Sequence, residues 1–588
     1  MRRQRLMFAA IAAALAGSVT FAQPGRGGSQ WLTALADAQR TSWVRADDKI
    51  SVASLSKPGF DQRWKSKLDN PPRGANGLAQ GVTASGVTLF VPMSVVAGSS
   101  NNVYGIDNDL GYVVWRRHFD AALPGATAAC AGGITSAATR IVKLDSPTTA
   151  AQAGFGGGRG RGVVGYRSLL GEPGEGVPAE GRAAGPGRGG DPSAAPGGRG
   201  APPGVEQGAR GAMPPPPAPA LSAANQAVDR IPGAPRAEEG SSPFGFLFRP
   251  SGVSYVVSSD GMLHVLGLAS GKDIQRPAPF LPANAKWSAP VAVGTSLYAA
   301  TSGKCGGAPD GVWAIDLDSD AKPVVSWKTN GGGVVGAVAF TPDGTLIAAI
   351  GPGKATGDGK ANAIVALDPK TLQLKDWFSQ PTAEFVTGPT ILRHNNRNIV
   401  AAATKDGRVL LLDAASLGGS DHATPLAASK PLFGAGASVG ADALAAWQES
   451  SGTSWILLPA KGRLATVKEA VNGGVLALKL VDAGGALSLE SNWVSNDLVS
   501  PTTPLIVNGV VFTLASGAPT GTGRGAAAVL YAYDGATGKP LWNSGKAMTS
   551  PASPGSMWSG LGQVYVGLQD GTLHAFGFND ERRHTNGQ

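Results

Sequence analysis

The chain has 588 residues, with 85 glycines, 43 prolines and only 15% charged residues. Abundant glycine beside few charges is typical of many short strands joined by tight turns. The formal net charge is +9, but the lysines and arginines form no basic stripe in the sequence, which argues against a nucleic-acid partner.

The N-terminus has the pattern of an export signal. Arg2, Arg3 and Arg5 precede an apolar run over 6–15, and small residues lead up to Ala22. We therefore predict a signal peptide over 1–22, cleaved near Ala22, and a periplasmic or secreted mature protein. An uncleaved anchor is the alternative, although the apolar run is shorter than the ~20 residues that span a bilayer. No later stretch reaches that length, so no transmembrane segment is expected.

Residues 23–80 form an N-terminal segment ahead of a repeated phrase. The segment contains Trp64 in a run with strand character, and the last copy of the phrase, at 573–576, runs into a polar tail over 581–588. We predict that the strand around Trp64 completes the last repeat unit, because pairing the two chain ends removes an exposed sheet edge.

The repeated phrase occurs eight times from residue 103 onward. It reads hydrophobic, bulky, small, hydrophobic and usually Asp, and the clearest copy is Leu530–Asp534, followed by Gly538 and Trp542. The other copies are at 103–107, 263–266, 312–316, 364–368, 409–413, 475–478 and 573–576. From the second copy on, the bulky position recurs every 43 to 66 residues. This period predicts an all-β, eight-bladed β-propeller with four-stranded blades, its ring closed by the N-terminal strand.

Each part of the phrase has a physical role in such a blade. Alternate residues of a strand point to opposite faces, so the outer and middle positions are expected to pack against neighbouring blades. The Asp accepts hydrogen bonds from the next amides, and the Gly takes the positive φ of the turn. Tryptophans that follow the phrase are predicted to lie in outer strands and to pack between blades. They are Trp115, Trp327, Trp377, Trp493 and Trp542.

The middle of the chain differs in composition from the repeats. We predict the first blade region over 81–150 and the remaining blades over 241–580. Between them, 151–240 is rich in Gly, Pro and Arg and poor in apolar residues, which predicts a disordered insert. Its Gly–Arg clusters resemble RNA-binding boxes, but acids nearly balance the arginines, so a solvated loop is the favoured interpretation.

The two cysteines, Cys130 and Cys305, lie near the second and third predicted blades. In an oxidising compartment they can form one disulfide. The sequence leaves this bridge open, because it does not show whether the two Cα atoms approach within ~6 Å.

Three segments resemble the pyrroloquinoline-quinone-type (PQQ-type) propellers: DAQRTSWVRADDKIS at 37–51, LYAYDGATGKPLW at 530–542 and GQVYVGLQDGTLHAFGF at 562–578. The resemblance covers the mature chain apart from 151–240. It implies the propeller fold and, in the dehydrogenases of this superfamily, a quinone held on the axis with calcium beside a catalytic Asp.

The chain departs from those dehydrogenases at the residues that matter for catalysis. Cys130 and Cys305 are far apart in sequence and cannot form the neighbouring-cysteine disulfide of many such alcohol dehydrogenases. A calcium set of Glu, Asn and Asp cannot be matched, and no Cys-x-x-Cys-His indicates covalent haem. The catalytic and cofactor-binding residues therefore stay unknown, and PQQ and calcium are cofactors only if the chain is an enzyme.

Isolated polar residues suggest no recognisable site either. Asp260, Asp310 and Glu384 fall in loop-like positions and could offer oxygens to calcium, but surface turns are their expected role. His264 and His574 stand in the bulky column of the phrase, which indicates packing, and no metal site is predicted. Further basic residues fit either a polar channel mouth or ordinary solvated loops: Arg393, Arg397, Lys461 and Arg463.

Two functions remain after these observations. The favoured hypothesis is an exported, monomeric propeller that acts as a non-catalytic binding or scaffold protein, with an envelope protein or a small ligand at one propeller face. The alternative is a PQQ- and calcium-dependent dehydrogenase that oxidises an alcohol or a sugar. The repeats carry the fold prediction, but fold analogy alone does not choose between these functions.

Overall fold

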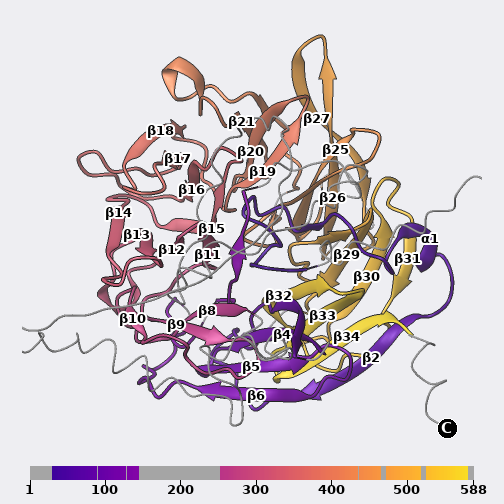
Figure 1. The fold of residues 1–588 in the computed structure, drawn as a ribbon. Helices are drawn as coiled ribbons and strands as arrows, with labels where there is room; N and C mark the ends of the chain where they lie inside the picture. The colour runs from indigo at the N-terminus through magenta and orange to yellow at the C-terminus, as the bar shows by residue number, and fades with distance from the viewer. Residues whose placement is uncertain are drawn as a thin grey trace, which may run out of the picture.

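The computed structural model describes residues 30–579, apart from 89–90, 128, 135, 145–251, 435, 465–471 and 518–524. The predicted signal peptide, the predicted insert over 151–240 and the tail over 581–588 lie outside the described residues. The strands form eight sheets arranged around one axis (Figure 1), so the predicted eight-bladed β-propeller is confirmed.

The first four blades are built from short strands. Blade 1 consists of β3 (Val82–Thr88), β4 (Val91–Gly98), β5 (Asn102–Asp107) and β6 (Val113–His118). Blade 2 has three strands, β8 (Val253–Val257), β9 (Met262–Gly267) and β10 (Ala278–Pro279). Blade 3 has five, β7 (Ile141–Val142), β11 (Val291–Val293), β12 (Ser296–Thr301), β13 (Gly311–Asp316) and β14 (Val324–Lys328). Blade 4 consists of β15 (Val334–Phe340), β16 (Leu346–Ile350), β17 (Ala363–Leu367) and β18 (Leu374–Ser379).

The other four blades complete the ring. Blade 5 consists of β19 (Thr390–His394), β20 (Arg397–Ala403), β21 (Val409–Asp413) and β22 (Ala427–Ala428). Blade 6 contains β23 (Ser438–Val439), β24 (Ala445–Gln448), β25 (Ser454–Lys461), β26 (Gly473–Ala483) and β27 (Ala486–Val494). Blade 7 contains β1 (Trp43–Val44), β28 (Leu505–Val507), β29 (Val510–Ala515), β30 (Val529–Asp534) and β31 (Pro540–Asn543). Blade 8 consists of β32 (Ala552–Gly560), β33 (Gln563–Leu568), β34 (Thr572–Phe578) and β2 (Phe60–Lys67), and a short helix, α1 (Val52–Leu55), precedes β2.

The antiparallel order of each blade gives the ring two distinct ends. The inner and third strands run in one direction, and the second and outer strands return in the other. We call the end at which the inner strands begin the leading end, and the opposite end the trailing end. Turns between second and third strands lie at the leading end, whereas turns between third and outer strands lie at the trailing end.

The N-terminal closing strand is confirmed. Strand β2 pairs antiparallel with β34, with Trp64 opposite Ala575, and supplies the outer strand of blade 8. Figure 1 shows this indigo strand beside the yellow end of the chain. Strand β1 adds to blade 7 through a parallel pairing with β28. The first and last parts of the described chain are thus held in common sheets, which leaves no unpaired edge between them.

Every copy of the repeated phrase forms the strand that pairs with the outer strand of its blade: β5, β9, β13, β17, β21, β26, β30 and β34. In β30, Leu530 and Ala532 are fully buried, and the Asp534 carboxylate accepts hydrogen bonds from the Ala536 and Thr537 amides at 3.0 and 3.2 Å. Gly538 then adopts φ +73°, which reverses the chain into the outer strand. Strand alternation and local turn chemistry together generate the blade.

The tryptophans of the outer strands join neighbouring blades, as predicted. The Trp493 indole N–H of blade 6 donates to the Gly535 carbonyl of blade 7 at 2.8 Å. Trp115 of blade 1 makes the same contact with the Leu268 carbonyl of blade 2 at 2.7 Å. A Cβ atom on Gly538 would lie 2.7 Å from the Trp493 ring, so the turn glycine leaves room for the ring of the preceding blade.

One connection crosses three blades. The backbone of Thr139 bridges to Tyr255 in blade 2, and the next residues form β7, which pairs parallel with β11 in blade 3. The region assigned from the sequence to the first blade, 81–150, therefore also contributes to the two blades that follow. Within the described ranges, no helix has the length and apolar character needed to cross a bilayer.

Candidate functional site

The chain's own N-terminal residues line the ring axis. Residues 31–44, here the axial segment, run through the middle of the ring (Figure 1). Their carbonyls accept hydrogen bonds of 2.8–2.9 Å from amides in the inner strands of blades 1, 4, 5, 6 and 7, and from the amide of Arg140 beside β7. These donors are Thr83, Arg140, Phe340, Ile391, Ala446 and Ile506. The axial segment therefore connects blade 1 to blade 7 through backbone contacts.

The path of the axial segment needs an unusual backbone. Leu35, Ala36, Arg40 and Ser42 all have φ between +57° and +74°, a region that residues other than glycine rarely adopt. Such residues persist only where the surrounding structure holds them in place. The hydrogen bonds to the inner strands provide that constraint, and the resulting curvature lets the segment follow the ring.

Arg40 is the most deeply placed charge of the axial segment. Its side chain is fully buried and donates to the Ala34 carbonyl at 2.7 Å and to the carbonyls of Val338 and Ala289 at 2.8 and 3.0 Å. Burial lowers the pKa of its guanidinium to about 10, whereas the charge of Asp37 raises it. The guanidinium therefore fills the axis and ties the axial segment to blades 3 and 4.

A carboxyl group lies on the leading side of the axial segment. The Asp442 carbonyl accepts a hydrogen bond from the Gly388 amide at 2.8 Å, and Gly336 packs against both backbones, so blades 4, 5 and 6 meet here. The Asp442 side chain is exposed, yet the protein packed beside it raises the pKa of its carboxyl by desolvation. Its own backbone amide and the charge of Lys286 lower that pKa. Asp442 is a carboxyl group that sequence reasoning missed.

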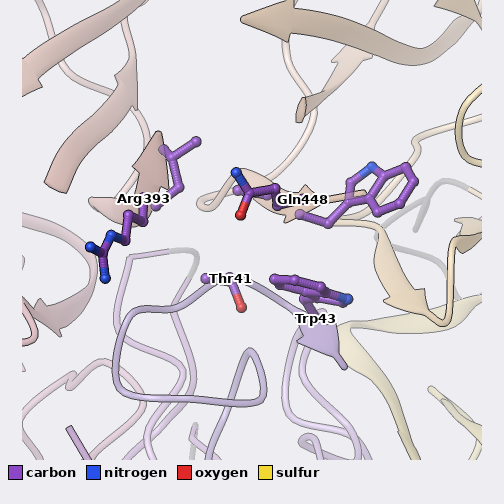
Figure 2. Close-up of a pocket in the computed structure, with 7 residues that line it drawn as sticks. Thr41, Trp43, Arg393 and Gln448 are labelled. Atoms are coloured by element: carbon purple, nitrogen blue, oxygen red, sulfur yellow. The ribbon is translucent and has the colours of Figure 1, made fainter. Parts of the chain in front are cut away.

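A small depression lies on the trailing side of the axial segment. Thr41 and Trp43 of the segment line it, together with Arg393 of β19 and Gln448 of β24. Figure 2 shows the flat Trp43 ring below Gln448, with Arg393 on the opposite side. Its enclosed space of about 10 Å³ holds one water at most. The depression suits a contact with a single side chain better than it suits a cofactor.

The acidic residues considered from the sequence occupy ordinary turns. Asp260 accepts hydrogen bonds from Ser258 and from the Met262 amide, Asp310 accepts from the Lys304 amide, and Glu384 pairs with Lys405 at 2.8 Å. In the part of the chain that the structure describes, no three His, Cys, Asp or Glu side chains are grouped as a metal site requires. The structure does not bring Asp260, Asp310 and Glu384 together.

The basic residues considered for a channel mouth are divided between the two ends. Arg393 lines the trailing depression, and Arg397 pairs with Asp413 at 3.7 Å. Lys461 and Arg463 lie in the turn after β25, at the leading end. The four residues therefore do not surround one channel mouth.

His264 belongs to a hydrogen-bonded group that the sequence did not reveal. Its Nδ1 atom lies 2.9 Å from Asp273 Oδ1, and its Nε2 atom lies 3.1 Å from Ser258 Oγ, which is the order of a Ser–His–Asp triad. Ser258 is fully buried, however, so no substrate reaches its hydroxyl. Arg117 of blade 1 also pairs with Asp273 at 3.0 Å, and the Phe119 ring packs against His264 at a tilt of 34°. The group therefore braces blade 1 against blade 2.

His574 is buried in β34, and its titration should affect the stability of the folded protein in acid. Burial is the main cause that lowers its pKa, to about 4, and the charge of Lys65 contributes. Because the folded state binds the proton of this imidazole more weakly than the unfolded state, the folded state has its full stability above the unfolded pKa of about 6.5. It loses stability as the pH falls toward 4. The unmodified chain should lose roughly 3 kcal/mol of unfolding free energy between pH 6.5 and 4 through His574. We expect His574→Asn to lack this part of the decrease, measured by urea unfolding at both pH values. An unchanged loss in the variant would contradict this role.

Cys130 and Cys305 form a disulfide, with their Cα atoms 5.6 Å apart. The bond links the loop after β6 to the turn between β12 and β13, at the leading end of the ring. We expect the double variant Cys130→Ser/Cys305→Ser to lose roughly 3 kcal/mol of unfolding free energy, because the bond closes a long loop. Thiol titration of denatured protein should find no free thiol before reduction. Free thiols before reduction would contradict the bond.

The structure is an eight-bladed β-propeller, a fold that the chain shares with quinoprotein alcohol dehydrogenases. The chain is similar to the quinohemoprotein alcohol dehydrogenase ADHIIG from Pseudomonas putida HK5, with 12% identity, a TM-score of 0.50 and coverage of 95% of this chain and 80% of that chain. It is also similar to a europium-containing methanol dehydrogenase, with 10% identity, a TM-score of 0.52 and coverage of 94% and 99%. At such identities the likeness shows the fold alone.

Other comparisons add no family assignment. No family model matches the sequence, and no match is found among curated proteins. BamB from Moraxella catarrhalis matches 57% of this chain and 82% of that chain with 13% identity, but its TM-score of 0.36 is too low to support an argument. The two dehydrogenase structures confirm the resemblance to PQQ-type propellers at the level of the fold.

The residues on the axis do not fit a calcium-bound quinone. Calcium prefers six or more oxygen ligands, several of them carboxylates. Asp442 offers one carboxyl group there, and the described residues contain no acidic cluster around it. The guanidinium of Arg40 and the backbone of the axial segment occupy the centre of the ring. We therefore derive no reaction step through this cofactor.

Proposed function

We propose that the protein is an exported propeller that acts as a non-catalytic binding or scaffold protein in the cell envelope. The main support for this proposal is that the axial segment fills the ring axis, where its carbonyls accept hydrogen bonds from blades between 1 and 7. Because the protein's own backbone fills the centre of the ring, a partner or ligand would bind at the outer faces of the ring. The predicted signal peptide and the disulfide between Cys130 and Cys305 support an oxidising compartment outside the cytoplasm.

The alternative is a PQQ- and calcium-dependent dehydrogenase for an alcohol or a sugar. The raised pKa of the Asp442 carboxyl favours it, because functional acids and bases often have perturbed pKa values. The propeller fold is compatible with this function but does not select it. Substitution of Asp442 can therefore distinguish the two functions, because only the dehydrogenase would need its carboxyl group.

A calorimetric titration with PQQ in millimolar calcium tests the choice, followed by dye reduction with alcohols and sugars. We expect no calcium-dependent binding and no dye reduction. Tight binding with activity would overturn the binding role. In that case Asp442→Asn should abolish activity, whereas Asp310→Asn, in a turn at the same end of the ring, should leave it unchanged.

A further inference from the structure

Charged residues are divided unequally between the two ends of the ring. At the leading end of blades 3 to 6, the turns and connections expose many basic side chains, which we call the basic face. It consists of the exposed Lys286, Lys304, Lys328, Lys354, Lys405, Lys430, Lys461 and Arg463, together with the half-buried Lys360 and Arg408. The acids in the same loops are fewer, namely Asp310, Asp358, Glu384, Asp406, Asp442 and Asp497.

The loops of the basic face form one continuous arc. The Ser302 amide donates to the Lys286 carbonyl at 3.0 Å, which joins the two leading loops of blade 3. The Gly332 amide donates to the Lys360 carbonyl at 3.0 Å, which ties the blade 4 turn to the connection from blade 3. Farther along, the Gly434 amide approaches the Arg463 carbonyl at 3.3 Å and links blades 5 and 6. The positive charges therefore lie on one connected surface.

The trailing end of the same blades has the opposite character, and the repeat explains why. The Asp that ends the phrase in blades 3, 4 and 5 lies at the trailing end, where its carboxylate accepts amide hydrogen bonds in the turn. Asp316 binds the Asp318 amide at 2.9 Å, and Asp368 binds the Lys370 and Thr371 amides at 3.0 and 2.9 Å. Turn chemistry thus fixes carboxylates at one end of the ring, and the lysines of the basic face lie at the other.

Several charges of the basic face have no acidic partner. Lys405 pairs with Glu384 at 2.8 Å, and Arg408 pairs with Asp406 at 2.5 Å. In contrast, Lys304, Lys354 and Lys461 make no ion pair with any residue that the structure describes, and all three are exposed. Each of the three belongs to a different blade, namely blades 3, 4 and 6. Their charges are available to a partner.

We propose that the basic face docks an acidic protein surface, an inference that rests on the binding role proposed above. A protein partner fits better than an anionic membrane, because membrane surfaces recruit exposed apolar residues beside basic ones. The exposed large apolar side chains of the described chain are elsewhere, in the trailing turn of blade 1 and in outer strands. They are Leu110, Tyr112, Val113, Val114, Val324 and Val325.

The test compares two charge-reversed variants of the full mature chain. Lys304→Glu/Lys461→Glu changes the basic face, and Lys370→Glu/Lys539→Glu makes the same change in charge at exposed trailing turns. Fluorescence anisotropy with labelled poly-glutamate of about 20 residues, a length that spans several blades at up to ~3.5 Å per residue, measures affinity at two salt concentrations. We expect the basic-face variant to bind about tenfold more weakly, and the trailing-end variant to bind nearly as well as the unmodified chain.

Each outcome decides the inference. Equal affinities of the two variants would overturn the basic face as the docking surface. Binding to phosphatidylglycerol vesicles without binding to poly-glutamate would also overturn it, in favour of a membrane. Dye reduction with PQQ and calcium would overturn the binding role instead. The inference and the proposed function therefore fail by different measurements, and thermal unfolding of both variants checks that each is folded.

Discussion

Replacing Arg40 by Met should lower the unfolding free energy by about 5 kcal/mol. The guanidinium donates to the carbonyls of Ala34, Val338 and Ala289, and a methionine would leave these acceptors in the ring centre without donors. Each buried acceptor that loses its partner costs about 1–3 kcal/mol. The measurement is urea unfolding of the mature chain at neutral pH.

Two further variants make the Arg40 result interpretable. Arg40→Lys keeps the charge but replaces the planar fork of donors, and we expect it to lose about 3 kcal/mol. Arg276 is exposed, so Arg276→Met should change stability by less than about 0.5 kcal/mol. If Arg40→Met proved as stable as the unmodified chain, apolar packing alone would hold the axial segment. If Arg40→Met does not fold, the difference between the Lys and control variants still tests the role.

Replacing Trp493 by Ala should cost about 4 kcal/mol. The ring is almost fully buried, stacks on Tyr533 with centroids 6.1 Å apart and donates to the Gly535 carbonyl of the next blade at 2.8 Å. The substitution removes a large apolar contact between blades 6 and 7 and leaves a cavity. Thermal and urea unfolding with far-ultraviolet circular dichroism measure the loss.

The neighbouring glycine offers an independent test of the same contact. In Gly538→Ala the new Cβ would meet the Trp493 ring at 2.7 Å and the backbone would keep φ +73°, so we expect a loss of about 2 kcal/mol. Trp327 serves as the matched control, because it is only partly buried; Trp327→Ala should cost about 1 kcal/mol. Equal losses for Trp493→Ala and Trp327→Ala would show that the interblade hydrogen bond and its turn have no special role.

The repeated phrase was readable because its physics is short-ranged. Alternation along β30 and the hydrogen bonds from Asp534 to the next amides involve residues within one turn of each other. The same applies to the tryptophans of the outer strands, which follow each turn at a short spacing. The pairing of β2 with β34 could also be predicted, because the last phrase lacked an outer strand.

The functional candidates could not be predicted in this way. Arg40 in the sequence resembles any charge beside polar residues, and its burial arises because backbone carbonyls near residues 289 and 338 converge on it. Asp442 has a raised pKa because it lies where blades 4, 5 and 6 meet, a condition that no local pattern encodes. The geometry that joins Cys130 to Cys305 likewise depends on how blade 3 stands beside the loop after β6.

The sequence by itself determined the number of blades and the turns that place an Asp at the end of most copies of the phrase, because these depend on contacts between near neighbours in the chain. It also determined the strand that closes the ring, because the last phrase lacked an outer strand. The tertiary structure alone decided that residues 31–44 fill the axis, that Asp442 lies in a partly enclosed setting, and that lysines of four blades gather on one face. These features arise when segments hundreds of residues apart are stacked around a common axis, where burial and charge are shared between blades.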